Sequence, residues 1–388
     1  MTKAKNKYNN KPLKVVSLFD GISCGRLAIE NAGFTVESYV AFEIDKHAKA
    51  ISRYNYPDII QCGDVLEADF TQFKDFDMVI GGSPCTFWSI AKTNREVDKS
   101  GMGWKLFMCF VNALKAIRPK YFLYENVASM PDSIKAYITE ELKSDPVMIN
   151  SALLSAQQRK RLYWTNIKGV TQPKDKGILL ADIIESGLPL NQEKSWCMTA
   201  RYGGAVFPHD FIRHQKSMIA EPIFNDCSET DSLFSCQSLG AALRTREDKT
   251  GRYKRLEVRK DGKLNTLTTV LTDSVVCEPV KLGELGKGGQ GYRVYSVYGK
   301  TICLSANGGG LGAKTGLYKI DLPDGDYYIR KLTPIEAERC QTLPYGYTAL
   351  GIDENGKEVK ISDTQRYKCI GNGWTADVIS HILEHIRR

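Results

Sequence analysis

The chain has 388 residues, 42% hydrophobic and 25% charged, which is typical of a soluble globular protein and long enough for two domains with separate cores. Lys and Arg number 53 against 45 Asp and Glu, and the resulting net charge of +8 is compatible with a polyanionic partner without establishing one. Eleven scattered cysteines without a Cys-x-x-Cys pair argue against a disulfide framework or a zinc site, and a polar, lysine-rich N-terminus without long apolar runs predicts a cytoplasmic protein.

The first predicted strand, Lys14 to Phe19, leads into a turn from Asp20 to Gly25 and then a helix from Arg26 to Ala32. A glycine-containing turn of this kind presents backbone N–H groups at a helix N-terminus and lets a ligand approach closely. The spacing is not the dinucleotide Gly-x-Gly-x-x-Gly, so a tight turn without a ligand is an equally good interpretation.

Acidic side chains follow the next two predicted strands. Glu43 lies at the end of the strand from Glu37 to Ile44, and Asp64 follows the strand from Ile59 to Cys62. An exposed Asp in a turn is unremarkable by itself. Because ligands of open α/β sheets bind beyond the carboxyl ends of the strands, three polar strand ends on one edge predict a site for an adenosine-like ligand.

The fourth predicted strand, Met78 to Ile80, is followed by two glycines. The turn that they predict brings Cys85 to the same edge of the sheet as the carboxylates. A cysteine in this position is more often a small buried hydrophobe than a nucleophile. The polar, glycine-containing segment 92–103 then precedes a predicted helix from Leu106 to Ile117. It is either a mobile lid or a plain surface loop.

A fifth predicted strand, Tyr121 to Tyr124, is followed by Glu125, another carboxylate on this edge. Predicted strands from Val147 to Leu154 and from Leu162 to Ile167 flank the basic segment Gln157 to Arg161. Its cations contact phosphates or belong to a solvated turn.

The alternation of strands and helices stops near Gly169 and helical patterns return only at Pro334 to Gln341 and at Thr375 to Arg387. Between them lie many glycines, short β-like runs such as Val294 to Tyr298, and basic residues interleaved with tyrosines, so we predict a smaller, β-rich or irregular domain. These clusters suit nucleic-acid binding, although a solvated surface explains the charge equally simply. The apolar stripe of the last helix predicts that it packs on the first sheet, which makes the β-rich segment an insertion.

These motifs, in this order along the chain, resemble those of the DNA cytosine-5 methyltransferases of prokaryotic or phage type. The similar blocks are Phe19-Asp-Gly-Ile-Ser-Cys-Gly25, Gly82-Ser-Pro-Cys85, Glu125-Asn-Val127, Gln157-x-Arg159-x-Arg161, Arg330-x-Leu-Thr-Pro-x-Glu336-x-x-Arg339-x-Gln341 and Gly371-Asn372-Gly373. Four positions depart from the usual pattern: Ser23-Cys24 replaces a common Gly-Gly, Thr86 replaces Gln, and Trp374 stands near the cofactor where small residues are more frequent.

The resemblance implies an α/β fold with a doubly wound, mostly parallel, Rossmann-like sheet and a smaller β-rich target-recognition domain. Residues 1–168 and 360–388 would form the catalytic and cofactor-binding domain, and residues 169–359 the inserted domain. The implied activity is transfer of a methyl group from S-adenosylmethionine to C5 of cytosine in duplex DNA at a specific sequence. S-adenosylhomocysteine is the second product, and no metal is required.

In the implied mechanism Cys85 adds to C6 of a flipped-out cytosine, because C5 is otherwise too weak a nucleophile. Arg159 would favour the thiolate, Glu125 would hydrogen-bond N3 and the exocyclic amino group, and Arg161 would contact O2 and hold Glu125. The cofactor residues implied by the resemblance are Phe19, Asp20, Gly21, Ile22, Ser23, Cys24, Gly25, Glu43 (ribose), Ile44, Asp64 (adenine), Val65, Pro84, Leu106, Asn372 and Gly373. The implied DNA contacts are Ser89, Arg201, Arg244, Arg246 and Arg252.

The partners we expect are double-stranded DNA and, in a restriction-modification system, a cognate endonuclease. We expect a monomer on DNA and no membrane partner. Two alternatives stay open: the same chemistry on a tRNA cytosine, and a catalytically silent DNA-binding regulator.

Overall fold

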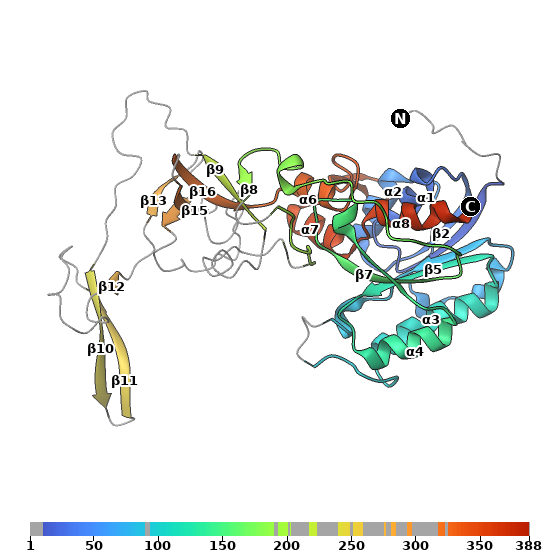
Figure 1. Ribbon diagram of the computed structural model, residues 1–388, viewed down its shortest axis with the longest axis horizontal. Coiled ribbons are helices and arrows are strands. Elements are labelled where there is room, and N and C mark those ends of the chain that lie inside the picture. The colour runs from blue at the N-terminus through green and yellow to red at the C-terminus, as the bar shows by residue number, and fades with distance from the viewer. Residues whose placement is uncertain are drawn as a thin grey trace. The chain divides into compact units, whose positions relative to one another are not determined.

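The computed structural model describes residues 11–89, 94–189, 193–200, 202, 217–222, 240–248, 251–258, 275–276, 281–284, 293–296, 317–322 and 325–387. The chain forms two compact units (Figure 1). The first comprises residues 1–183, 193–203 and 333–388, and the second comprises residues 184–192 and 204–332.

The first unit is built on a seven-stranded sheet of order β3-β2-β1-β4-β5-β7-β6. Its strands are β1 (Leu13–Leu18), β2 (Val36–Phe42), β3 (Ile60–Gln61), β4 (Met78–Gly81), β5 (Tyr121–Val127), β6 (Val147–Asn150) and β7 (Lys160–Thr165). Strands β1 to β5 pair in parallel, and β7 is antiparallel to both of its neighbours. The order reverses between β1 and β4, so this sheet has the topological switch point at which α/β proteins bind ligands.

Helices cover both faces of the sheet (Figure 1). The helices of this unit are α1 (Cys24–Asn31), α2 (Lys46–Asn55), α3 (Met102–Ile117), α4 (Asp132–Leu142), α6 (Pro334–Cys340), α7 (Asp363–Asn372) and α8 (Ala376–Glu384). Short 3-10 turns are η1 (Val65–Glu67), η2 (Phe70–Phe73), η3 (Cys85–Phe87), η4 (Ser151–Leu153), η5 (Leu180–Asp182) and η7 (His385–Arg387), and β17 (Leu350–Ile352) pairs with β18 (Glu358–Lys360).

Alternation along β1 sends successive side chains into two separate cores. Val16 belongs to the cluster that contains Phe107 and Phe110 of α3, whereas Val15 belongs to the cluster that contains Ile29 of α1 and Ile382 of α8. The predicted packing of the last helix on the first sheet is therefore confirmed, and the predicted doubly wound α/β fold is present.

Element ends differ from the sequence prediction where local chemistry interrupts a strand. β1 ends at Leu18 because Phe19 has φ +58°, in the left-handed region. The strand predicted from Val147 to Leu154 ends at Asn150, whose side chain accepts the Ala152 N–H and starts η4. β5 continues to Val127, so Glu125 lies within the strand and not after it.

The second unit contains two small sheets, of order β13-β14-β15-β16-β9-β8 and β11-β10-β12. Their strands are β8 (Leu188–Pro189), β9 (Met218–Pro222), β10 (Gly240–Asp248), β11 (Gly251–Val258), β12 (Val275–Val276), β13 (Lys281–Glu284), β14 (Arg293–Ser296), β15 (Leu317–Leu322) and β16 (Gly325–Lys331). All pairings are antiparallel except β14 with β15.

Three stretches of the predicted insertion, 169–183, 193–203 and 333–359, lie in the first unit. Close packing explains the last stretch, because a Cβ on Gly351 of β17 would lie 2.9 Å from Cβ of Ala50 in α2. Within the described ranges, no helix is long and apolar enough to span a bilayer.

Candidate active site

A cavity of about 260 Å³ lies at the carboxyl ends of β1, β2, β4 and β5 in the first unit. All four predicted catalytic residues line it: Cys85, Glu125, Arg159 and Arg161. So do ten predicted cofactor residues, namely Phe19, Gly21, Ile22, Glu43, Ile44, Asp64, Val65, Pro84, Leu106 and Asn372. The other five predicted cofactor residues do not line the cavity: Asp20, Ser23, Cys24, Gly25 and Gly373. They belong to segments 19–25 and 371–374, which supply other lining residues.

The loop after β1 is held in an unusual conformation. The backbone φ angles are 58° at Phe19, 61° at Gly21 and 61° at Ser23. Residues other than glycine rarely adopt this left-handed backbone conformation. Ser23 stabilises the loop itself, because its hydroxyl donates to Asp20 Oδ2 at 2.6 Å and lies 2.7 Å from Ser52 Oγ. Tyr39 donates to Asp20 Oδ1 at 2.7 Å, and burial raises the pKa of Asp20 to about 6.

The two predicted adenosine-binding carboxylates are fixed by backbone N–H groups. Glu43 accepts three hydrogen bonds of 2.8 Å, from the N–H groups of Gly21, Ile44 and Asp45. Asp64 caps η1 by accepting the Leu66 N–H at 2.9 Å. Both carboxylates are thus presented rigidly beside the cavity.

Cys85 lies at the start of η3, in a loop that β5 holds in place. Its carbonyl accepts the N–H groups of Trp88 and Ser89, at 3.1 and 2.9 Å. Asn126 of β5 is buried and donates from Nδ2 to the Ser83 carbonyl at 3.1 Å. Asn126 therefore ties the strand that carries Glu125 to the loop that carries Cys85.

Burial raises the pKa of the Cys85 thiol, and the negative charge of Glu125 raises it further. The cations Arg161 and Arg159 act in the opposite direction but do not outweigh these effects. In this structure Cys85 is therefore a largely protonated thiol near neutral pH.

Glu125 and Arg161 form an ion pair at the cavity. Glu125 is opposite Tyr163 in the β5–β7 register, so Arg161, two residues along β7, lies on the same face. Arg161 Nε is 3.0 Å from Glu125 Oε1, and the two side chains are only 12% and 11% exposed. Trp374 donates from Nε1 to the other carboxylate oxygen, Oε2, at 3.0 Å.

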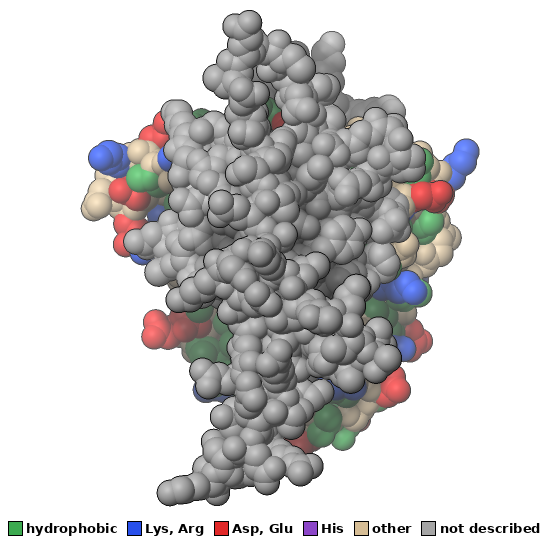
Figure 2. All heavy atoms as spheres, turned by 90° about the vertical axis from the view of Figure 1, so that its left-hand side faces the viewer, with side chains coloured by type: hydrophobic (Ala, Val, Ile, Leu, Met, Phe, Trp, Pro, Cys, Tyr) green, Lys and Arg blue, Asp and Glu red, His purple; other side chains and the backbone are tan. Residues whose placement is uncertain are grey.

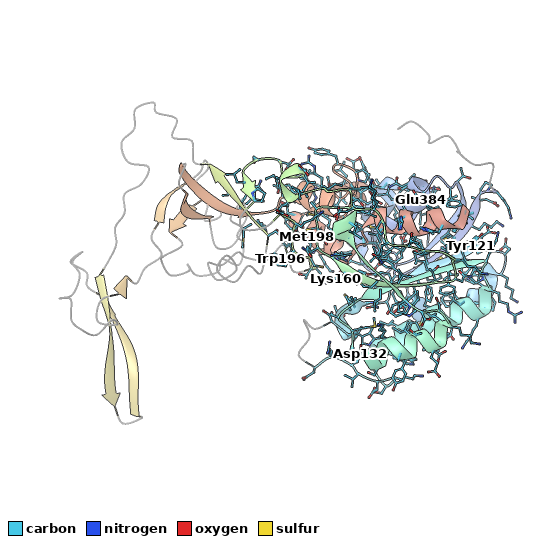
Figure 3. The ribbon with its side chains drawn as sticks, in the orientation of Figure 1. Tyr121, Asp132, Lys160, Trp196, Met198 and Glu384 are labelled. Carbon is cyan, nitrogen blue, oxygen red and sulfur yellow. The ribbon has the colours of Figure 1, made fainter. Side chains whose placement is uncertain are left out.

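Arg159 connects three backbone segments. Its guanidinium donates to the carbonyls of Gly373 at 2.9 Å, Met198 at 3.1 Å and Gly371 at 3.2 Å. Segment 193–200, with the labelled Trp196 and Met198, lies along this end of β7 near Lys160 (Figure 3). Arg159 thus holds the segment after α7 against the cavity while supplying positive charge.

A second thiol, that of Cys197, lies beside Arg159 and Arg161. The sequence did not indicate it. Its Sγ is 3.5 Å from Arg159 Nη1 and 3.7 Å from Arg161 Nη2. Burial tends to raise the pKa of Cys197, but the two guanidinium charges outweigh it and lower the pKa. The two thiols near these arginines therefore have pKa values displaced in opposite directions.

The segment after Cys85 is anchored where the structure describes it. Glu96 accepts the Gly103 N–H at 2.9 Å, and Arg95 donates to the Ser129 carbonyl at 2.8 Å. Thr86 lines the cavity and Ser89 does not. Of the other predicted DNA contacts, Arg201 lies outside the described residues, and for Arg244, Arg246 and Arg252 the structure describes the strand positions alone, in β10 and β11.

Several lining residues were not predicted as site residues. They are Phe42, Asp45, Ala48, Gly63, Gly82, Ser83, Thr86, Lys368, Cys369, Gly371 and Trp374. Among these, Gly82, Ser83 and Gly371 stand in the motif blocks, and Thr86 and Trp374 depart from the motif pattern, so the sequence indicated these five. Among the described residues there is no group of three or more His, Cys, Asp or Glu side chains that would hold a metal ion.

A thiol, a carboxylate and a guanidinium facing one cavity provide a nucleophile, a proton donor or acceptor and a fixed positive charge.

The family model for C-5 cytosine-specific DNA methylases matches residues 13–388 of the chain. The chain is 25% identical over 374 residues to the Type II methyltransferase M.HhaI of Haemophilus parahaemolyticus, which covers 96% of this chain and 94% of that protein. It is 31% identical over 168 residues to the orphan methyltransferase M.SPRI of Bacillus phage SPR, covering 40% and 38% of the two chains. Among solved structures, the Entamoeba histolytica methyltransferase EhMeth has a similar fold, with a TM-score of 0.54 and 13% identity over 97% of this chain and 98% of that one.

Proposed function

Because the chain belongs to the family of C-5 cytosine-specific DNA methylases, we propose that it methylates C5 of a cytosine within a specific sequence of duplex DNA, through a covalent adduct of Cys85. The observation that carries the proposal is the convergence of Cys85, Glu125 and Arg161 on one cavity. The same cavity contains carboxylates on neighbouring strand ends that suit an adenosine.

The cavity residues fit S-adenosylmethionine. Glu43 is held by three backbone N–H groups in a position to accept ribose hydroxyls, and Asp64 is positioned to accept from the adenine amino group. The lining also contains Ile44, whose side chain is 71% exposed and provides an apolar surface for a base. When bound, this cofactor supplies the methyl group.

In the proposed reaction Cys85 gives up its thiol proton to solvent, and the positive charges of Arg161 and Arg159 favour the thiolate. The sulfur then adds to C6 of the cytosine, which makes C5 nucleophilic. Glu125 bonds N3 and the amino group of the ring and provides a proton as negative charge develops there. Arg161 contacts O2 and keeps Glu125 in place, as their ion pair at 3.0 Å supports. Once C5 carries the methyl group, water takes the C5 proton, the C6–S bond breaks and N3 returns its proton to Glu125, which releases Cys85 as the thiolate.

The target base must leave the duplex to reach Cys85, at a cost of a few kcal/mol. We propose that segment 86–103 closes over the flipped base and that the second unit reads the sequence in the major groove. Strands β10 and β11 support this role, because they place Arg244, Arg246 and Arg252 in one hairpin. The Type II relative suggests a cognate restriction endonuclease as a further partner.

The test is methyl transfer by wild type and Cys85→Ala with tritiated cofactor. We expect the variant to lose methyl transfer and to keep its affinity for S-adenosylmethionine in calorimetry, because the thiol acts on the base. Retained methyl transfer by Cys85→Ala would refute the mechanism.

Two parallel measurements decide between the alternatives. Tritium transfer to duplex DNA and to tRNA, compared at equal cytosine concentration, separates the DNA enzyme from a tRNA enzyme, and we expect transfer to DNA. Duplex DNA containing 5-fluorocytosine should trap a covalent complex with the wild type, whereas a silent regulator would form none.

A further inference from the structure

Trp374, which departs from the small residues usual at its position, contacts the carboxylate proposed to act on the base. Its indole lines the cavity, and Nε1 donates to Glu125 Oε2 at 3.0 Å. Arg161 Nε is 3.0 Å from the other oxygen, Oε1. Each carboxylate oxygen of Glu125 therefore has its own donor, one from β7 and one from the turn between α7 and α8.

The indole sits in space that Gly82 provides and packs beside Gly25. A Cβ on Gly82 would lie 3.3 Å from Trp374 Nε1 and 2.9 Å from Glu125 Oε2, whereas a Cβ on Gly25 would be in ordinary contact with the ring, 3.5 Å from Cζ3. Gly25 belongs to the first turn of α1, and Gly82 to the loop that leads to Cys85. The ring is thus packed between the start of α1 and the Cys85 loop.

The backbone on both sides of Trp374 is also fixed. The Gly373 carbonyl accepts from Arg159 Nη2 at 2.9 Å and from Gln341 Nε2 at 3.3 Å. Thr375 donates to Gln341 Oε1 at 2.7 Å and lies 2.9 Å from Ser151 Oγ. With its backbone held and its ring packed, the indole N–H has a defined direction, toward Glu125.

We propose that Trp374 is a positioning residue, which fixes the plane of the Glu125 carboxylate so that it faces the ring N3 and amino group of the target cytosine. The inference rests on the proposed function. An ion pair at one oxygen leaves the carboxylate free to rotate about its terminal bond, whereas donors at both oxygens remove that freedom. Each oxygen keeps a second lone pair: one accepts the amino N–H of the cytosine, and the other holds the proton that Glu125 donates to N3 when it acts on the base.

The variant Trp374→Phe tests the proposal, because it keeps an aromatic ring and removes the N–H donor. We expect kcat for duplex DNA to fall about ten- to a hundredfold, the usual range for losing a hydrogen bond to a charged group. The Kd of S-adenosylmethionine and the KM for DNA should stay within about twofold. Tyr345→Phe, which removes an aromatic donor at a side chain that is 77% exposed and outside the cavity lining, is the matched control and should leave kcat unchanged.

A double-mutant comparison separates positioning of Glu125 from a general structural role. If Trp374 acts through Glu125, adding Trp374→Phe to Glu125→Gln should lower kcat by less than about twofold, since the group it positions is already impaired. A structural role predicts the full loss in both backgrounds. The separate variant Gly82→Ala, whose Cβ would press on Glu125 Oε2 and the indole, should reproduce the kcat loss without a change at Trp374.

Unchanged kcat in Trp374→Phe, or a full additive loss in the double variant, would overturn this inference. Either result leaves the proposed function standing if wild type still forms the 5-fluorocytosine adduct. Loss of that adduct in wild type would instead count against the proposed function itself.

Discussion

At the scale of single residues, the site places ionisable groups in surroundings that move their pKa values in different directions. Asp20 and Cys85 are partly buried without enough compensating charge, and the pKa of each is raised. Cys197 is also partly buried, but it lies beside two guanidinium groups and its pKa is lowered. A pKa shift in the folded state implies a dependence on pH that can be measured.

The carboxyl of Asp20 should make the protein less stable as the pH rises from 4 to 7. Its pKa is about 6 in the folded state against 3.8 for an unperturbed carboxyl, so in this window the folded state binds a proton that the unfolded state has lost. The resulting loss is about 2–3 kcal/mol, from about 1.4 kcal/mol per pKa unit. Asp20→Asn removes the titrating group.

Urea unfolding of wild type and Asp20→Asn at several pH values checks this prediction. The free energy of unfolding of Asp20→Asn minus that of wild type should increase as the pH rises from 4 to 7, because only wild type loses the contribution of the protonated carboxyl. A difference that stays constant across the window would show that Asp20 has an ordinary pKa in the folded state.

The two thiols near Arg159 and Arg161 should react with alkylating agents at different pH. Because only the thiolate reacts, Cys85 alkylation in the free protein should keep rising about tenfold per pH unit between pH 7 and 9, whereas Cys197 should level off at a lower pH. Peptide mapping by mass spectrometry after short iodoacetamide pulses measures both residues in one sample. Parallel pH profiles for the two would contradict the electrostatic argument.

At the scale of elements, the cavity results from parallel strands that end at one sheet edge, and this part of the site could be predicted from sequence. Glu43 and Cys85 follow short apolar strands, and the carboxyl ends of parallel strands must meet. Trp374 and Cys197 could not be placed in this way. Trp374 reaches the cavity from a segment 249 residues from Glu125, and Cys197 reaches the two arginines from a segment 36 residues from Arg161, so only the tertiary fold brings them there.

Strand boundaries were harder to predict than strand existence, because side-chain capping competes with strand continuation. Asn150 ends β6 by capping η4, which no apolar pattern reveals. The apolar pattern of β5 also stops before Glu125, so it does not show that Glu125 lies inside the strand. Its neighbour Asn126 is on the opposite face of the strand and reaches the loop after β4.

Asn126→Ala should disconnect the Cys85 loop from β5. The variant loses the donor to the Ser83 carbonyl and the side-chain oxygen that accepts the Val127 N–H at 2.8 Å. We expect kcat to fall at least tenfold, because a small displacement of a nucleophile is costly, while the Kd of S-adenosylmethionine changes less than about threefold. Single-turnover adduct formation and calorimetry provide the two readouts. A loss confined to cofactor affinity would mean that Asn126 supports the cofactor loops instead.

At the scale of the whole molecule, the excess of positive charge is modest and its effect depends on where the cations lie. Figure 2 shows Lys and Arg interspersed with Asp and Glu on the coloured surface, so the described residues visible there give little net attraction for a polyanion. The β10–β11 hairpin has a different composition. Its register pairs Arg244 with Arg255 and Arg246 with Tyr253, so these four positions lie on one face of the hairpin.

This hairpin should contribute to DNA affinity through phosphate neutralisation. For the double variant Arg244→Ala/Arg246→Ala we expect weaker DNA binding and a smaller salt dependence, because each lost phosphate contact lowers the slope of log K against log salt concentration by about 0.9. Fluorescence anisotropy with a labelled duplex between roughly 50 and 200 mM salt, a range in which such contacts dominate, measures the slope. The affinity for S-adenosylmethionine serves as the control, since its cavity belongs to the first unit and should be unaffected. If the salt slope were unchanged while affinity for one sequence fell, the two arginines would read bases and not phosphates.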